Sequence, residues 1–181
     1  MSDPIVIVDY HPDWPGRFRA LGAQLRGALG PVALRIDHIG STAVPGLAAK
    51  PIIDVQVSVA SFEPLDAIRA PLEALGWVYR GDNPDLAKRY FREAPGTRRT
   101  HLHVRLLGSW AEQHALLFRD YLRAHPDNAA RYAAVKRALA RRYRADRHAY
   151  TEGKGEIIWE ITARAHAWHM AMGWVAGPSD A

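Results

Sequence analysis

Apolar side chains recur along this chain at spacings that predict an alternation of helices and strands. Recurrence at three- and four-residue intervals predicts helices over 13–29 and 61–75, each followed by a glycine. Alternating apolar and polar positions predict a strand over 34–39, and a β-branched run predicts another over 52–59. The Gly- and Pro-rich stretch "GSTAVPGLAAKP" lies between these strands and predicts a loop.

The strand predicted over 52–59 has two different faces. Successive side chains of a strand point to opposite sides, so its β-branched residues share one face. Asp54, Gln56 and Ser58 share the other. We therefore expect an apolar face against the core and a polar face that carries one carboxylate.

Three short strands follow, over 77–80, 88–92 and 100–106. The sequences "GDNPD" and "APGTR" separate them, and both have the composition of turns.

The final third of the chain has a helical pattern. Ser109 and Glu112 form a capping-box pattern ahead of a helix that ends before Pro126. A second helix is predicted from Asn128 to about His148. After the loop sequence "TEGKGE", a third is predicted over 157–172.

This order predicts an α+β fold with α/β-like features: a mixed sheet of about five strands, flanked by helices, with a helical C-terminal third. The length of 181 residues fits one domain, 1–181, with a sheet core over 1–108 and helices over 109–173 packed on it.

Composition narrows the class of protein. There is no cysteine, which excludes disulfides and thiolate-bound metals. No apolar run reaches the length of a membrane span, and the start of the chain lacks the pattern of a signal peptide, so we expect a cytoplasmic protein without a membrane partner. The net charge of +5 favours a phosphate-bearing partner, although arginines on a solvated helix face explain it equally well.

Two features near the first two strands carry candidate chemistry. Gly40 permits close approach to the backbone after a strand, and Ser41 can hold a phosphate oxygen, although such a pair is also an ordinary turn. Asp54 is costly within an apolar strand unless it binds a partner. It is either a site residue or the structural partner of an arginine such as Arg89 or Arg99.

The sequence "THLHV" adds two histidines to one strand face, His101 and His103. They can bind a metal, contact a phosphate or transfer protons, or else one is simply buried and the other exposed. His38, two residues before Gly40, is expected at the edge of the same pocket. Lys50 and Lys154 can neutralise phosphates, although lysine is most often a surface residue.

The residues as a whole resemble a known family. "HIGSTAVPGLAAKPIIDVQV", "HLHV", "FRDYLRAHPDNAARYAAVKRALA" and "YTEGKGEII" are similar to the GrpB family of small bacterial proteins, over nearly the whole chain. That family resembles the nucleotidyltransferase superfamily in fold. There a Gly-Ser turn holds nucleotide phosphates, an acid-x-acid pair on the next strand holds divalent metal, and a third acid lies on a later strand.

The resemblance assigns Gly40 and Ser41 to the phosphate turn and Asp54 to the first acid. The second acid should lie at position 56, where this chain has Gln56, and the third falls where it has histidines. These departures put standard two-metal nucleotidyl transfer in doubt. Some relatives carry a similar domain fused to dephospho-coenzyme A kinase, which associates the family with nucleotides or coenzyme A.

We therefore expect a protein that binds a nucleotide or another phosphate ester and transfers a nucleotidyl group. Asp54 and His103 would be catalytic, with Asp54, His101 and His103 holding a divalent metal: Mg²⁺ or Mn²⁺ first, Zn²⁺ second. The alternatives are a catalytically silent module that binds a nucleotide or a coenzyme A-related molecule, and a metal-dependent hydrolase. Nucleic-acid binding rests on charge alone and ranks last.

Overall fold

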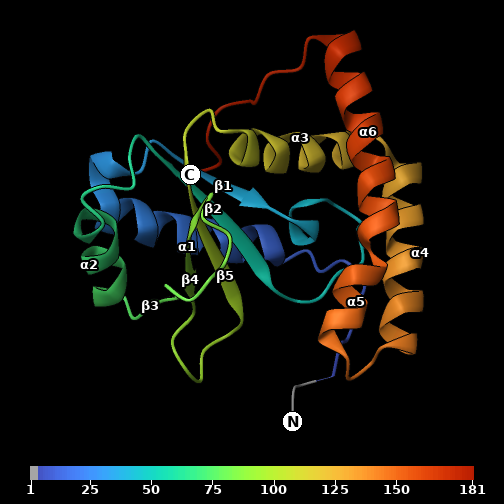
Figure 1. Cartoon of the computed structure of the whole chain (residues 1–181), viewed down its shortest axis with the longest axis horizontal. Coiled ribbons are helices and arrows are strands. Elements are labelled where there is room, and N and C mark those ends of the chain that lie inside the picture. Colours follow the sequence, from blue (N-terminus) through green and yellow to red (C-terminus); the bar gives the residue numbers. More distant parts are fainter. Residues whose placement is uncertain (1–3) are drawn as a thin grey trace.

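The computed structural model describes residues 4–181 and shows a central mixed sheet covered by helices (Figure 1). Its strands are β1 (Arg35–Ile39), β2 (Ile53–Val59), β3 (Val78–Tyr79), β4 (Arg89–Arg92) and β5 (Thr100–Leu106). Its α-helices are α1 (Trp14–Leu29), α2 (Asp66–Ala74), α3 (Trp110–Ala124), α4 (Pro126–Arg142), α5 (Arg147–Gly153) and α6 (Gly155–Met172).

The strand order across the sheet is β1-β2-β5-β4-β3. β2 and β5 run parallel, and the other neighbouring pairs run antiparallel. The predicted mixed sheet with a helical C-terminal third is therefore confirmed. Residue 54 pairs with residue 101 in this register, and residue 56 pairs with residue 103, so the polar positions of β2 and β5 share one face.

The apolar face of the sheet packs on the early helices. Val55, Val57, Leu102 and Val104 are fully buried in a cluster that also contains side chains of α1 and α2. This cluster is the main core, and the alternation of β2 predicted which side of the strand would face it.

The late helices build a second core around the loop between β1 and β2. Val44 and Leu47 of this loop are buried against side chains of α3, α4 and α6. The helices α4, α5 and α6 stand together at one end of the sheet, on the right of Figure 1. The loop is thereby held between the sheet and the late helices.

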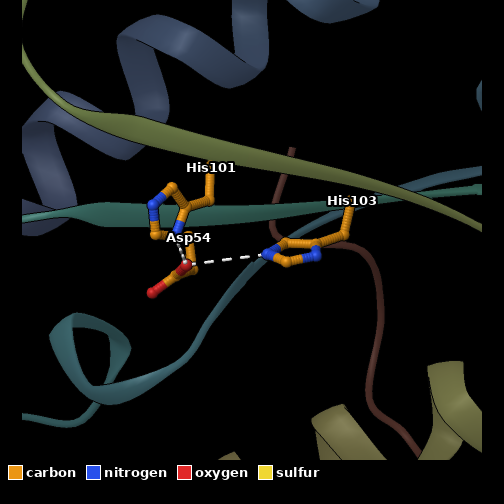
Figure 2. A group of neighbouring side chains, drawn as sticks. All are labelled: Asp54, His101 and His103. Carbon is orange, nitrogen blue, oxygen red and sulfur yellow. Dashed lines mark hydrogen bonds and ion pairs between the residues drawn. The ribbon is translucent and has the colours of Figure 1, made fainter. Parts of the chain in front are cut away.

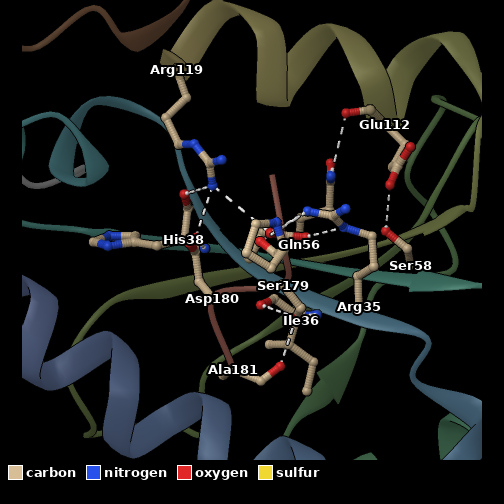
Figure 3. Close-up of polar contacts among 12 residues, drawn as sticks. Arg35, Ile36, His38, Gln56, Ser58, Glu112, Arg119, Ser179, Asp180 and Ala181 are labelled. Carbon is tan, nitrogen blue, oxygen red and sulfur yellow. Dashed lines mark hydrogen bonds and ion pairs between the residues drawn. The ribbon is translucent and has the colours of Figure 1, made fainter. Parts of the chain in front are cut away.

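A layer of polar contacts joins α3 to the other face of the sheet (Figure 3). Glu112 of α3 is fully buried and accepts a hydrogen bond from Ser58 at 2.8 Å. The expected capping box forms in part: the Glu112 amide donates to Ser109, while its carboxylate accepts from the Gly108 amide. Glu112 thus takes part in the cap of α3 and also holds α3 against β2.

The C-terminal residues lie along β1 and satisfy its outer backbone groups (Figure 3). Ser179 accepts from the Ile36 amide at 2.8 Å, and Asp180 accepts from the His38 amide at 2.9 Å. The Ala181 amide donates to the Ile36 carbonyl at 3.1 Å. An exposed edge strand invites pairing with other chains, and this segment covers it.

Several predicted boundaries were wrong. The helix expected over 61–75 begins at Asp66, and the strand expected over 77–80 is only Val78–Tyr79. The helix expected from residue 128 begins at Pro126, because proline is well tolerated in the first turn.

The same helix was expected to continue to His148, but it ends at Arg142. Asp146 then caps a separate helix, α5, by accepting from the Ala149 amide at 3.0 Å. The sequence "TEGKGE" is therefore mostly helical, and α5 and α6 meet at Lys154.

Over residues 4–181, none of the helices combines the length and the apolar character that crossing a membrane requires.

Candidate functional site

Asp54 and two histidines form a compact group on the polar face of the sheet (Figure 2). Oδ1 of Asp54 lies 2.8 Å from Nδ1 of His101 and 3.6 Å from Nε2 of His103. The parallel register of β2 and β5 places all three side chains together. The acid therefore contacts two histidines, whereas Arg89, one of the two arginines considered as its structural partner, pairs with Glu63.

The charge states of this group follow from burial and proximity. Burial opposes ionisation of Asp54, but hydrogen bonds and charge from the two histidines outweigh it and hold the pKa of this carboxyl well below its usual range. Burial lowers the pKa of His103, and the nearby Asp54 carboxylate only partly offsets this effect. At neutral pH the group thus offers an ionised carboxylate beside a neutral imidazole.

Gly40 lies directly against Asp54 at the end of β1. Its φ of +71° is one that L side chains rarely adopt, and a Cβ there would lie 2.6 Å from Oδ2 of Asp54. Glycine is therefore needed at position 40 for the turn to approach the carboxylate. A short 3₁₀ turn, Ser41–Ala43, follows at once.

Lys136 of α4 reaches this turn from a distant part of the chain. Its ammonium group donates to the Ser41 hydroxyl at 2.9 Å and to the Ala48 carbonyl at 2.6 Å. The residue is only 3% exposed, and burial, with repulsion from nearby cations, lowers its pKa to about 7.

Two further lysines lie beside the same turn. The ammonium groups of Lys50 and Lys154 lie 5.2 Å and 4.9 Å from the centre of the Tyr150 ring. Burial lowers the pKa of both, that of Lys50 to about 8. Within residues 4–181 neither lysine forms an ion pair, and the attraction of Asp54 does not offset the cost of burial, an arrangement that favours a bound anion.

These residues surround one cavity of about 260 Å³. Its lining includes Gly40, Ser41, Lys50, Asp54, His101, Tyr132, Lys136, Tyr150 and Lys154. Six of the predicted site residues therefore lie at one cavity: Gly40, Ser41, Lys50, Asp54, His101 and Lys154. His103 does not belong to the lining, but its Nε2 lies 3.6 Å from Oδ1 of Asp54.

His38 is placed elsewhere. It pairs with Val55 in the register of β1 and β2, so it points to the opposite face from Asp54. Its ring stacks on Phe18 at 4.8 Å, and Nε2 lies 3.0 Å from the Thr42 hydroxyl. The expectation that His38 lies at the edge of the pocket is wrong, because a one-residue step along a strand reverses the face.

Gln56, at the position of the family's second acid, shares the sheet face of Asp54 but contacts other residues. It is fully buried, accepts a hydrogen bond from Arg105 at 2.6 Å and donates to the Glu112 carbonyl at 3.3 Å. The residue joins β2 to β5 and α3, and it does not line the cavity.

The group around Asp54 fits a divalent metal ion. One oxygen of Asp54 and one nitrogen from each histidine all lie within 4.8 Å of one another. A carboxylate with two imidazoles suits Mn²⁺ or Zn²⁺ better than Mg²⁺, which prefers oxygen ligands. Of the two metals expected first, the donor set therefore favours Mn²⁺ over Mg²⁺.

Lys136, Tyr132 and Tyr150 were not predicted as site residues. The sequence does hold one signal: Lys136 follows Tyr132 by four residues, so a lysine occupies the apolar stripe of α4. The arginines nearby made the segment resemble a solvated basic face, and this hid the buried lysine.

Comparison with solved structures shows the type of fold. A conserved GrpB protein from Enterococcus faecalis superposes with a TM-score of 0.84 and 33% identity, covering 91% of this chain and 99% of that one. A cytoplasmic RNA terminal U-transferase superposes with a TM-score of 0.52 and 16% identity, covering 75% of this chain and 41% of that one. The fold is therefore nucleotidyltransferase-like.

Sequence comparison finds relatives of two kinds, UPF0157 proteins and dephospho-CoA kinases. A UPF0157 protein of Pseudomonas aeruginosa is 44% identical over 169 residues, which cover 92% of this chain and 69% of that protein. A dephospho-CoA kinase of Mycolicibacterium paratuberculosis is 35% identical over 196 residues, and the match covers 94% of this chain but only 48% of the kinase. The model of the GrpB protein family matches residues 4–164. Most of the chain lies within that match, and the chain therefore belongs to the GrpB family.

Proposed function

We propose that this protein binds a nucleotide or another phosphate ester in the cavity above Asp54 and transfers its nucleotidyl group. The observation that carries the proposal is the charge of the cavity. Three half-buried or buried lysines (Lys50, Lys136 and Lys154) surround it, and within residues 4–181 Asp54 is the one acid in its lining. A phosphate group would relieve the mutual repulsion of these cations.

Each part of the cavity has a distinct role in this proposal. The Gly40–Ser41 turn brings the backbone close to the ligand, and the Ser41 hydroxyl, already held by Lys136, contacts a phosphate oxygen. Lys50 and Lys154, which line the same cavity, neutralise the remaining phosphate charge as point charges.

Asp54, His101 and His103 would hold the divalent ion. When bound, it would supply positive charge to the phosphate oxygens beside the lysines. His101 lines the cavity, whereas His103 contacts Asp54 without belonging to the lining, so we assign His103 to holding and orienting the group.

Hydrolysis of a phosphate ester is a second candidate reaction, and the metal-ligand set favours it. The cavity has one carboxylate, and Gln56 is engaged with Arg105 and α3 at the position where nucleotidyltransferases carry a second acid. A mixed oxygen and nitrogen set is common in sites that activate water.

A binding measurement tests the proposal first. The protein is titrated with nucleoside mono-, di- and triphosphates, coenzyme A and dephospho-coenzyme A, with Mn²⁺, Zn²⁺ or Mg²⁺. Coenzyme A compounds are included because dephospho-CoA kinases contain a related region. A ligand at 100 times its Kd should stabilise the fold by about 2.7 kcal/mol.

Lys136→Met should weaken binding of every such ligand by about 10-fold, because the cation that holds the Ser41 hydroxyl at the phosphate position is lost. Arg141→Met is the matched control, since Arg141 is an exposed cation of the same helix outside the cavity lining. Absence of phosphate-ligand binding to the unmodified protein, or equal losses in the two variants, would refute the proposal.

Product analysis then separates the reactions. Nucleotidyl transfer from a nucleoside triphosphate releases pyrophosphate and labels an acceptor, whereas hydrolysis in H₂¹⁸O places the heavy oxygen in the product. Tight binding without either product identifies a catalytically silent module and overturns the catalytic half of the proposal.

A further inference from the structure

A second cavity adjoins the one above Asp54. It measures about 360 Å³, and Lys50 and Ile52 line both cavities. Lys50 is therefore shared by the two cavities.

The second cavity is strongly cationic. Arg17, Arg98, Arg99 and Arg147 line it together with Lys50. No acidic residue of the described chain, 4–181, belongs to its lining. These arginines come from α1, from the segment before β5 and from the start of α5, so three distant parts of the sequence converge.

Electrostatics shows that the two cavities share one field. Burial is the largest cause that lowers the pKa of Lys50, followed by repulsion from Lys154 on the first cavity. The Asp54 carboxylate opposes this shift, and Arg147 and Arg99 on the second cavity lower the pKa further by smaller amounts. Positive charge is thus continuous from the Gly40–Ser41 turn through Lys50 to the arginines.

The remaining wall of the second cavity is apolar. Pro4, Ile5, Val6, Pro51 and Ile52 form it. Arginine guanidinium groups bind phosphate through paired hydrogen bonds, and an apolar wall packs on the body of a small molecule. A purely electrostatic surface for a nucleic-acid backbone would not need an apolar wall.

We infer that the arginine-lined cavity binds a second phosphate group of a small-molecule substrate, separated from the phosphate at the Gly40–Ser41 turn by an apolar or flat body. This inference rests on the proposed phosphate site. It narrows the substrate class to phosphorylated small molecules that carry two separated anionic groups.

The test uses three probes that differ in where the second phosphate lies. Adenosine 5′-monophosphate has one phosphate, adenosine 5′-diphosphate has two adjacent ones, and adenosine 3′,5′-bisphosphate has two separated by the ribose. Each is titrated calorimetrically into the full chain with Mn²⁺. The test variant is Arg98→Gln with Arg147→Gln, both at exposed positions of the cavity lining.

The matched control is Arg19→Gln with Arg142→Gln, which removes the same charge at exposed positions outside both linings. We expect the bisphosphate to bind the unmodified protein about 10-fold more tightly than the monophosphate. The test variant should lose this advantage, while its affinities for the monophosphate and the 5′-diphosphate change less than about twofold. The control variant should retain all three affinities.

Equal binding of bisphosphate and monophosphate by the unmodified protein would overturn the inference while leaving the proposed function intact. Equal losses of affinity for the 5′-diphosphate and the bisphosphate in the test variant would also overturn it, because they would reflect only the overall positive charge of the protein. Failure of all three probes to bind refutes the proposed function itself. A short single-stranded RNA that displaces the bisphosphate and depends on the same arginines would replace the small-molecule substrate with a nucleic acid.

Discussion

Asp37 and Asp54 are acids on neighbouring strands and on the same face of the sheet, but their surroundings differ. Asp37 is fully buried, and Arg35 binds it with two hydrogen bonds of 2.9 and 3.0 Å. Arg119 of α3 lies 3.9 Å away on its other side. The Asp54 side chain is 26% exposed, contacts two histidines and faces a cavity.

The difference separates an acid that holds the fold together from one that is available for chemistry. Arginine is permanently charged and forms a fixed fork around a carboxylate, so Asp37 has no capacity left for a ligand. Imidazoles can be neutral and can share a metal with the acid they contact, so Asp54 keeps that capacity. The same residue type on one sheet face thus serves two purposes, according to the partner that the neighbouring elements supply.

The largest expected effect comes from removing the late helices, which supply contacts around both Asp37 and Asp54. A fragment of residues 1–108 lacks Arg119, which lies beside Asp37, and Lys136, which closes the cavity at Asp54. It also exposes the apolar loop side chains Val44 and Leu47. We predict an insoluble or molten product without a cooperative thermal transition in near-UV circular dichroism. A cooperatively melting fragment would show that 109–173 is a separable domain.

The second prediction is that Asp37→Asn lowers the free energy of unfolding by about 3–5 kcal/mol, because a buried arginine loses its counter-charge. Urea denaturation measures this change. Phosphate-ligand affinity of the folded fraction should change by less than about twofold, since Asp37 lies outside the cavity lining. Unchanged stability of this variant would show that Asp37 does not hold the fold together.

The third prediction is the converse for Asp54→Asn. Metal-dependent nucleotide binding should weaken at least 10-fold, which is about 1.4 kcal/mol, because the neutral amide is a poor metal ligand. Unfolding free energy at neutral pH should fall, but by less than for Asp37→Asn, because the ionised Asp54 is stabilised by its histidines. Calorimetric titration and urea denaturation on the same variant measure both quantities. A large loss of stability with intact affinity would place Asp54 in the structural class with Asp37.

The smallest effect concerns pH. The pKa values of Lys136 and Lys50 are lowered to about 7 and about 8, so both lysines lose their charge between about pH 6 and 9. Phosphate affinity should fall by about 10-fold or less as the lysines lose their charge. The charge of the phosphate does not compensate, because the phosphate is already dianionic above about pH 7.

The stability of the ligand-free protein should move in the opposite direction. Both lysines have folded-state pKa values below the ordinary 10.5, so between about pH 7 and 10.5 the unfolded chain binds more protons. Unfolding free energy therefore rises with pH across that window. Lys136→Met should reduce both trends, and an affinity that rises with pH would contradict the assignment of these lysines to the anion site.

The sequence by itself determined the local part of this picture. The period of two in β2 placed Asp54 opposite the core face, and the same rule placed His101 and His103 together on β5. Glycine and serine after the first strand indicated the turn, and the long family motif indicated the fold. These inferences hold because strand alternation and turn chemistry depend on residues adjacent in the chain.

The tertiary structure decided which partners those residues meet. Lys136 meets Ser41 across 95 positions of sequence, and the C-terminal Asp180 meets the amide of His38 across 142. The histidine partners of Asp54 depend on the parallel pairing of β2 with β5, which a strand's own pattern does not specify. Contacts of this kind form when whole elements bury their apolar faces against each other, so the chemistry of the cavity follows from packing between elements as much as from any single motif.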